Sequence, residues 1–165
     1  RDNYIGASTQ PNERLASWPV FFRERRLGHQ LSLAKANGAP VSILESGYKL
    51  MERLDDWFGD YIPVPSLLHG DLWGGNRGAL PDGRPALFDP AVYYGDRETD
   101  IAMTRLFGGF DESFYVAYDK EWPLDEGAIQ RQALYNIYHV LNHFNLFGGS
   151  YLTQAEHMLL RLLST

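Results

Sequence analysis

Apolar side chains recur every three or four residues along most of the chain, which is the spacing of amphipathic helices. The first such stretch predicts a helix with Pro19 in its first turn and Asn37-Gly38 at its end. Its apolar positions are Leu15, Trp18, Phe22 and Leu27. Later stretches predict further helices at about residues 42–58, 98–108, 112–120 and 126–147, and a last one that opens at Thr153.

Two of these helices are predicted to begin with a capping box. In that motif a hydroxyl residue and a glutamate three residues later satisfy each other's free backbone N–H groups. The two pairs are Ser42 with Glu45 and Thr153 with Glu156. Gly59 is predicted to end the helix that begins at Ser42.

The stretch RGALPDGRPALFDP, residues 77–90, breaks the helical pattern. Two short apolar runs flank Pro81-Asp82-Gly83, which is typical of a turn. We therefore predict a mainly helical α+β domain with one β-hairpin at about residues 78–88. HGDLWGGN, residues 69–76, lies just before this hairpin and Asp89 just after it. Loops held at the ends of rigid elements are common places for binding and catalysis.

Composition fits one globular domain and narrows the possible partners. The 165 residues are 44% hydrophobic, with no apolar run long enough to cross a bilayer and no signal-peptide pattern at the start. A net charge of −6 and scattered arginines argue against a nucleic-acid partner. The one basic cluster, RERR at 23–26, is predicted to be a solvated helix face. The absence of cysteine excludes disulfides and thiolate metal sites and fits a cytoplasmic location.

The polar residues beside the hairpin have the spacing of a kinase centre. His69, Asp71 and Asn76 follow the H-x-D-x-x-x-x-N pattern of a kinase catalytic loop. Asp89 stands beyond the hairpin, where kinases carry an aspartate that binds metal. We predict that Asp71 accepts the proton of an attacking hydroxyl, and that Asn76 and Asp89 hold Mg²⁺ beside ATP. HGDLWGGN alone could equally be a glycine-rich turn, so the prediction depends on the ordered set.

The sequence resembles the fructosamine-3-kinase (ketosamine-3-kinase) family, which are small-molecule kinases of the aminoglycoside-phosphotransferase-like branch of the protein-kinase fold. The resemblance covers nearly the whole chain. The segments that carry it are DNYIGASTQPN (2–12), HGDLWGGN (69–76), FDPAVYYGDRETDIAM (88–103), LFGGFDESFYVAY (106–118) and LYNIYHVLNHFNLFGGSY (134–151).

This resemblance implies ATP- and Mg²⁺-dependent phosphorylation of ketosamines at the sugar 3-hydroxyl. Ketosamines are sugar adducts of amines, including glycated lysines, and the phosphorylated adduct falls apart to free the amine. The roles of Asp71, Asn76 and Asp89 carry over as above, and Trp73 is implied to line the sugar-adduct pocket. Asp100 is implied to be a buried acceptor that braces the catalytic loop, which His69 also supports. The alternatives are a core tryptophan for Trp73 and a helix N-cap for Asp100.

The part of a kinase that holds the ATP phosphates is not found in this sequence. There is no G-x-G-x-x-G, and Lys35, Lys49 and Lys120 do not follow a strand pattern. We expect residues 1–165 to form the large, C-terminal lobe of the kinase-like fold and to be nearly inactive alone. Gly70 stands where protein kinases carry the arginine that docks a phosphorylated activation loop, so we do not expect that form of regulation.

Other functions stay open on the sequence alone. One is a different kinase of the same branch that acts on an aminoglycoside, choline or a sugar. Another is a truncated, non-catalytic binding module. His139 and His143 have the spacing of a zinc pair, but Val140 replaces the zincin glutamate, so we interpret them as core or pocket-wall histidines. The oligomeric state is not indicated.

Overall fold

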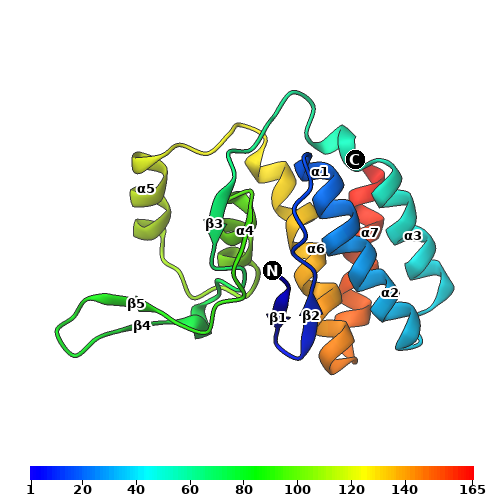
Figure 1. Cartoon of the computed structure of the whole chain (residues 1–165), viewed down its shortest axis with the longest axis horizontal. Helices are drawn as coiled ribbons and strands as arrows, with labels where there is room; N and C mark the ends of the chain where they lie inside the picture. The colour runs from blue at the N-terminus through cyan, green and yellow to red at the C-terminus, as the bar shows by residue number, and fades with distance from the viewer.

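The computed structural model describes all of residues 1–165, and most of its helices gather in a bundle on one side of the molecule (Figure 1). The bundle begins with α1 (Trp18–Phe21), a π-helical stretch (Phe22–Gly28) and α2 (His29–Ala36), which follow one another without a break. It is completed by α3 (Val41–Glu52), α6 (Ala128–Phe147) and α7 (Ser150–Ser164).

Helix α6 is the central element of the core. Residues 134–142 are all buried, so this helix is covered on every side by its neighbours. It packs against α2, α7 and α4 (Glu98–Leu106). Each fully buried leucine or isoleucine of such a core stabilises the fold by about 1.5–3 kcal/mol. The bundle therefore supplies a rigid base for the segments on its other side.

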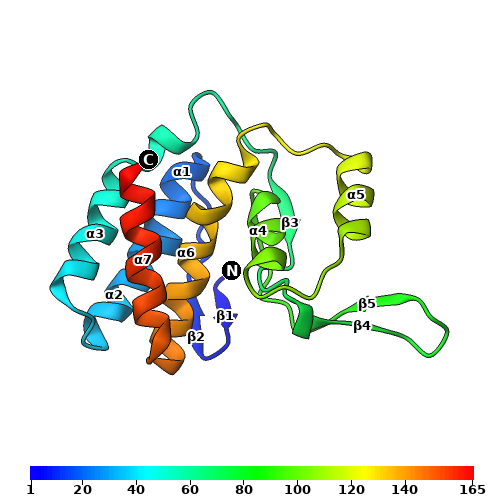
Figure 2. The same ribbon diagram turned by 180° about the vertical axis from the view of Figure 1, so that it is seen from behind.

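Those segments are α4, α5 (Glu112–Glu121) and three small antiparallel sheets of two strands each. The pairs are β1 (Asn3–Ile5) with β2 (Ser8–Gln10), β3 (Ser66–Leu68) with β6 (Tyr93–Gly95), and β4 (Arg77–Ala79) with β5 (Pro85–Leu87). The β4–β5 hairpin projects from the body in the views from both sides (Figures 1 and 2).

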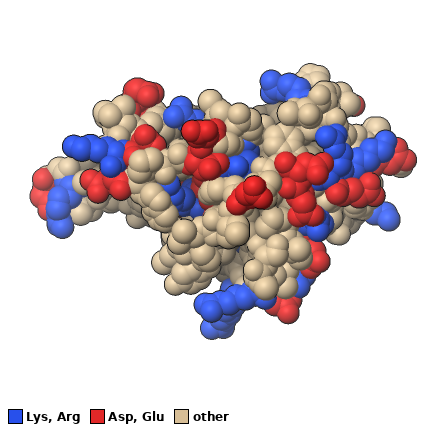
Figure 3. Space-filling model, turned by 90° about the horizontal axis from the view of Figure 1, so that it is seen from above, with Lys and Arg blue, Asp and Glu red and all other residues tan.

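The surface is charged but not dominated by one sign. Acidic and basic side chains are intermingled on the face seen from above (Figure 3). No helix combines the length and the hydrophobicity that crossing a membrane requires.

The helices and the hairpin confirm the predicted architecture, but the helix starts differ. Helix α3 begins at Val41 after Pro40, and α7 begins at Ser150 after two glycines with positive φ. Ser42 and Thr153 thus lie inside their helices, and both predicted capping boxes are wrong. The predicted end at Gly59 is also wrong, because α3 stops at Glu52 and a short 3₁₀ turn, Leu54–Trp57, intervenes.

The prediction of a single hairpin is wrong as well. Two further strand pairs, β1 with β2 and β3 with β6, were not expected from the sequence. Each of these strands has only three residues. Three residues are too few to display the alternation of apolar and polar positions that marks a strand.

Arg26 corrects the prediction that RERR is a solvated face. Its side chain is fully buried, and its guanidinium donates to Pro11 O (2.7 Å) and Asn12 Oδ1 (2.7 Å). It also lies over the ring of Tyr93, 4.0 Å from the ring centre. The neighbouring Arg25 is partly exposed and pairs with a surface glutamate, as predicted for the whole cluster. Tertiary contacts with the preceding loop decide which arginine is buried.

Replacing Arg26 by leucine is expected to lower the free energy of unfolding by at least about 2 kcal/mol, because each buried acceptor left unpaired costs about 1–3 kcal/mol. The measurement is urea denaturation followed by circular dichroism. The matched control is Arg84→Leu, since Arg84 is 73% exposed and pairs only with Asp82. That control should change stability by less than about 1 kcal/mol. Equal losses in the two variants would contradict the structural role of Arg26.

Candidate active site

The HGDLWGGN segment connects β3 to β4 and is fixed at its first residue. Ala91 N–H donates to His69 O (2.8 Å), which extends the pairing of β3 with β6 into the loop. His69 Nδ1 accepts from the N–H of Asp71 (3.3 Å), and its Nε2 lies 3.1 Å from Phe88 O. With a donor facing Nδ1 and an acceptor facing Nε2, these contacts fit the tautomer that carries its proton on Nε2. His69 thereby ties the start of the loop to the residue before Asp89.

Asp100, in the first turn of α4, holds the backbone of the same loop. Its two carboxylate oxygens accept from His69 N–H (2.7 Å) and Gly70 N–H (2.9 Å). Burial raises the pKa of Asp100, and these two backbone hydrogen bonds oppose that effect by favouring the carboxylate. The carboxylate therefore accepts hydrogen bonds from the loop and does not cap its own helix.

Gly70 has a conformation that no other residue could adopt without displacing its neighbours. Its φ is +81°, and a Cβ built on it would lie 2.0 Å from Ala91 O. An arginine at this position would require the loop and the segment around Ala91 to separate. The absence of the phosphate-docking arginine thus follows from how closely the two segments approach.

Asp71 and Asn76 are brought together as the sequence predicts. Asn76 is buried and its Nδ2 donates to Asp71 O (2.9 Å) and Asp71 Oδ2 (3.1 Å). Asp71 Oδ1 and Asn76 Oδ1 receive no hydrogen bond from the chain. Partial burial raises the pKa of the Asp71 carboxyl, and the nearby His143 and Asn76 reduce that rise. The loop thus presents a fixed carboxylate with one oxygen free to accept a proton.

Asp89 lies beside this pair across the base of the hairpin. Asn76 Nδ2 is 3.4 Å from Asp89 O, and Phe88 N–H donates to Asn76 O (3.1 Å). Asp89 is exposed, and it is the one non-glycine residue with positive φ, at 54°. Such backbone strain is commonly found at functional sites. Asp89 is thus a solvent-exposed residue whose backbone lies beside Asn76.

The donor set fits a hard divalent cation. Mg²⁺ prefers carboxylate and amide oxygens and usually retains several water ligands. Asn76 offers an unused amide oxygen and Asp89 an exposed carboxylate, while Asn76 Nδ2 is engaged by other oxygens. These two residues are the ones in this loop region that could hold such an ion.

Aromatic side chains line the other side of the loop. Trp73 is 38% exposed and meets Phe107 edge to face at 6.4 Å, so it is not a core tryptophan. His143 follows, 4.8 Å from Phe107 and 5.0 Å from Tyr151, measured between ring centres. We define Trp73, Phe107, His143 and Tyr151 as the aromatic wall. Sequence reasoning considered His143 only as a core or pocket-wall residue, and it lies in this wall.

His143 is oriented by its own helix. Its Nδ1 donates to His139 O at 2.8 Å, one turn earlier in α6, which leaves Nε2 without a partner in the chain. His143 lies close enough to Asp71 to lower the pKa of that carboxyl, so the wall and the carboxylate belong to one region. The LNHFNLFG motif was the available signal for this residue, although its spacing first suggested a zinc pair.

A contact between two glycine pairs was not anticipated. A Cβ on Gly109 would lie 2.5 Å from Gly74 Cα, so the LFGGF loop packs directly on the HGDLWGGN segment. The signal was the repeated Gly-Gly at 74–75 and 108–109. Backbone contact at this point positions Phe107, and hence the aromatic wall, against Trp73.

His139 gives a test of the core beneath the wall. Burial, aided by the charges of His143 and Arg26, lowers its pKa to about 3, so its ring stays neutral in the folded chain. The unfolded chain binds a proton near pH 6.5. Folding stability from this source is therefore complete above pH 6.5 and is lost as the pH falls toward 3, by up to about 1.4 kcal/mol per pH unit.

We expect this loss to be absent in His139→Leu. The measurement is the free energy of unfolding in urea for both proteins at pH 7.5 and pH 5.5. Between these values the stability of the parent should fall by about 1.4 kcal/mol relative to the variant. His139→Leu serves as the reference for the parent. The carboxylates titrate equally in both proteins, so their contribution cancels in the comparison. A constant difference over this range would contradict a neutral, buried His139.

Comparison with known proteins places this geometry in context. The sequence model of the family described as fructosamine kinase matches residues 1–165. A Synechocystis sp. protein named "Probable ketoamine kinase" is 50% identical over 160 residues, which are 96% of this chain and 52% of that protein. An Arabidopsis thaliana "Protein-ribulosamine 3-kinase, chloroplastic" is 42% identical over 154 residues, which are 93% of this chain and 47% of that protein.

A solved structure agrees with these similarities. The crystal structure of a "putative fructosamine-3-kinase" from Thermobifida fusca superposes with a TM-score of 0.90 at 35% identity. The superposition covers 99% of this chain and 57% of that one. The chain thus spans about half the length of the curated relatives that it matches.

Proposed function

Because this chain belongs to the fructosamine kinase family, we propose that it carries the catalytic centre of a kinase that transfers phosphate from ATP to ketosamines. The acceptor is the 3-hydroxyl of a sugar joined to an amine, either free or on a glycated protein. The observation that supports this most directly is the cluster of Asp71, Asn76 and Asp89 beside an exposed Trp73. The phosphorylated adduct would then break down and release the amine.

Asp71 is the base in this proposal. Asn76 fixes Asp71 Oδ2, so Oδ1 is the oxygen available to accept the proton of the sugar hydroxyl. Partial burial raises the pKa of Asp71, which makes it a stronger base than a solvated aspartate. Asn76 Oδ1 and the Asp89 carboxylate would hold Mg²⁺, which when bound neutralises charge on the ATP phosphates.

In this proposal the sugar of the ketosamine, which accepts the phosphate, binds against the aromatic wall. Aromatic faces such as that of Trp73 pack well against the apolar face of a sugar ring. His143 Nε2 has no partner in the chain and lies in the same wall, so it is available to hydrogen-bond a hydroxyl. The wall and Asp71 together would hold the sugar with one hydroxyl at the carboxylate.

We further propose that residues 1–165 are the large lobe of a kinase-like fold. The chain contains no glycine-rich phosphate loop and spans about half of its relatives' length. Holding the ATP phosphates would then require groups outside these residues, supplied in the relatives by the part that this chain does not match. On this proposal the 165 residues alone turn over little or nothing.

ATP consumption should be measured for two proteins. One is the 165-residue chain, and the other is a chimera that joins it to the part of the Synechocystis relative that it does not span. The acceptors are fructosyl-lysine, ribosyl-lysine adducts, choline, an aminoglycoside and a free sugar. We expect turnover by the chimera with the lysine adducts only. Preference for choline, an aminoglycoside or a free sugar would indicate another kinase of this branch. A folded but silent chimera would favour a non-catalytic binding module.

Replacing Asp71 by asparagine should lower kcat of the active chimera by about 10²–10⁴-fold, or about 3–5 kcal/mol of barrier. The reason is that an amide cannot accept the hydroxyl proton. In the parent, kcat should fall as the pH decreases through the raised pKa of Asp71, and this acid limb should vanish in the variant. Asp82→Asn, at the exposed hairpin turn, is the matched control and should leave kcat unchanged. Near-parental kcat in Asp71→Asn would exclude Asp71 as the base.

Asp89→Asn should abolish Mg²⁺-dependent turnover, because it removes the carboxylate that would hold the ion. Asparagine tolerates a positive φ, so this change tests the carboxylate without forcing the strained turn to rearrange. The measurement is initial rate as a function of Mg²⁺ concentration. An unchanged Mg²⁺ titration curve would show that Asp89 does not hold the ion.

A further inference from the structure

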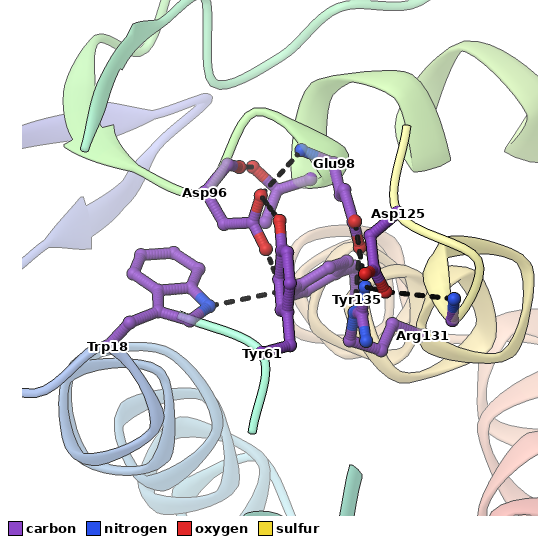
Figure 4. Close-up of polar contacts among 9 residues, drawn as sticks. Trp18, Tyr61, Asp96, Glu98, Asp125, Arg131 and Tyr135 are labelled. Carbon is purple, nitrogen blue, oxygen red and sulfur yellow. Dashed lines mark hydrogen bonds and ion pairs between the residues drawn. The ribbon is translucent and has the colours of Figure 1, made fainter. Parts of the chain in front are cut away.

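A buried ion pair joins helix α6 to the first turn of α4, two residues before Asp100. Arg131 Nε donates to Glu98 Oε2 (2.8 Å) and Arg131 Nη2 donates to Glu98 Oε1 (2.9 Å). The two side chains are only 4% and 3% exposed. Figure 4 shows the pair between α6 and the start of α4. This two-bond geometry fixes the planes of both groups, so α4 cannot rotate about its axis without breaking the pair.

The guanidinium of Arg131 is held by further groups. Arg131 Nη2 also donates to Asp125 Oδ1 (2.6 Å), in the loop before α6. The ring of Tyr61 covers the flat face of the guanidinium at 3.8 Å. Figure 4 shows these side chains converging from three segments on the start of α4. Arg131 is therefore held in position by groups other than Glu98.

Asp96 secures the same turn from the other side. Its Oδ1 accepts from Glu98 N–H (3.0 Å) and from the hydroxyl of Tyr61 (3.1 Å). Its Oδ2 accepts from the hydroxyl of Tyr135 (2.5 Å), which in turn accepts from Trp18 Nε1 (3.1 Å). Asp96 thus caps the start of α4 with its side chain and connects it to α1 and α6.

Hydrophobic side chains of similar size would commonly stabilise such a site as well as a buried ion pair does, because burying two charges is costly. What the pair supplies here is a defined position and rotation of α4. Asp100 lies in the same turn as Glu98, and its carboxylate holds His69 N–H and Gly70 N–H. A small rotation of α4 would move Asp100 away from the two amides that it binds.

We propose that Glu98 and Arg131 are positioning residues for the catalytic loop. They fix the first turn of α4 so that Asp100 holds His69 and Gly70, and the loop then places the Asp71 carboxylate. The effect on reaction rate rests on the proposed kinase function, whereas the effect on loop order does not.

Loop order is tested by amide hydrogen exchange of the chain, measured by NMR, in the parent and in Glu98→Gln. We expect exchange at His69 and Gly70 to become about tenfold faster or more, with much smaller changes at amides of α7. Arg131→Lys keeps the charge but loses the two-bond geometry, so it should give the same pattern. If Glu98→Gln does not fold, Arg131→Lys serves as the test variant in its place. Unchanged exchange at His69 and Gly70 in a folded variant would overturn the proposal.

The destabilised control is Leu162→Ala, in the buried face of α7. This change should speed exchange throughout the core without selecting His69 and Gly70. If the control reproduces the pattern of Glu98→Gln, the ion pair has only a general stabilising role and the proposal fails.

The effect of the ion pair on the reaction rate is tested in the active chimera. Glu98→Gln should lower kcat by about 10–100-fold with little change in KM, because the acceptor wall is intact while the base is displaced. In the Asp71→Asn background the same change should cost little more, since the group being positioned is already gone. Full additivity, or an unchanged kcat despite faster loop exchange, would overturn the positioning role. A parent chimera without ketosamine turnover would instead refute the proposed function and leave the exchange result to decide loop order.

Discussion

The arrangement of the candidate site depends on one carboxylate that accepts two backbone hydrogen bonds. Asp100 binds the N–H groups of His69 and Gly70, and so fixes the start of the segment that carries Asp71 and Asn76. A buried acceptor with two backbone donors is satisfied in one geometry only, which converts a glycine-rich segment into a defined structure. Asn76 can then reach both the backbone and the side chain of Asp71.

The site also requires glycine, because only glycine lets the backbones of neighbouring segments come into direct contact there. Gly70 lies against the carbonyl of Ala91, while Gly74 lies against Gly109. Both contacts bring separate segments together at backbone distance, which side chains would prevent. The loop is thus held from α4 by hydrogen bonds and from two neighbouring segments by direct packing.

The sequence predicted what depends on local pattern and on ordered spacing. The helices, the hairpin around Pro81-Asp82-Gly83, and the meeting of Asp71 with Asn76 were all foreseeable in this way. The burial of Arg26 was not, because it depends on acceptors from a loop more than ten residues earlier. The pairing of Glu98 with Arg131 spans 33 residues, and no local signal in either segment announces it. Two helix starts were mispredicted for a different, local reason, because Pro40 and Gly148-Gly149 outweighed the nearby hydroxyl residues.

Helix α6 supplies both Arg131, near its first turn, and His143, near its last. These residues are separated by about 18 Å at the usual rise of 1.5 Å per residue. Helix α6 therefore carries both the arginine that pairs with the first turn of α4 and one member of the aromatic wall. A displacement of α6 along its axis would therefore move Arg131 and His143 together, and with them one contact of α4 and one ring of the aromatic wall.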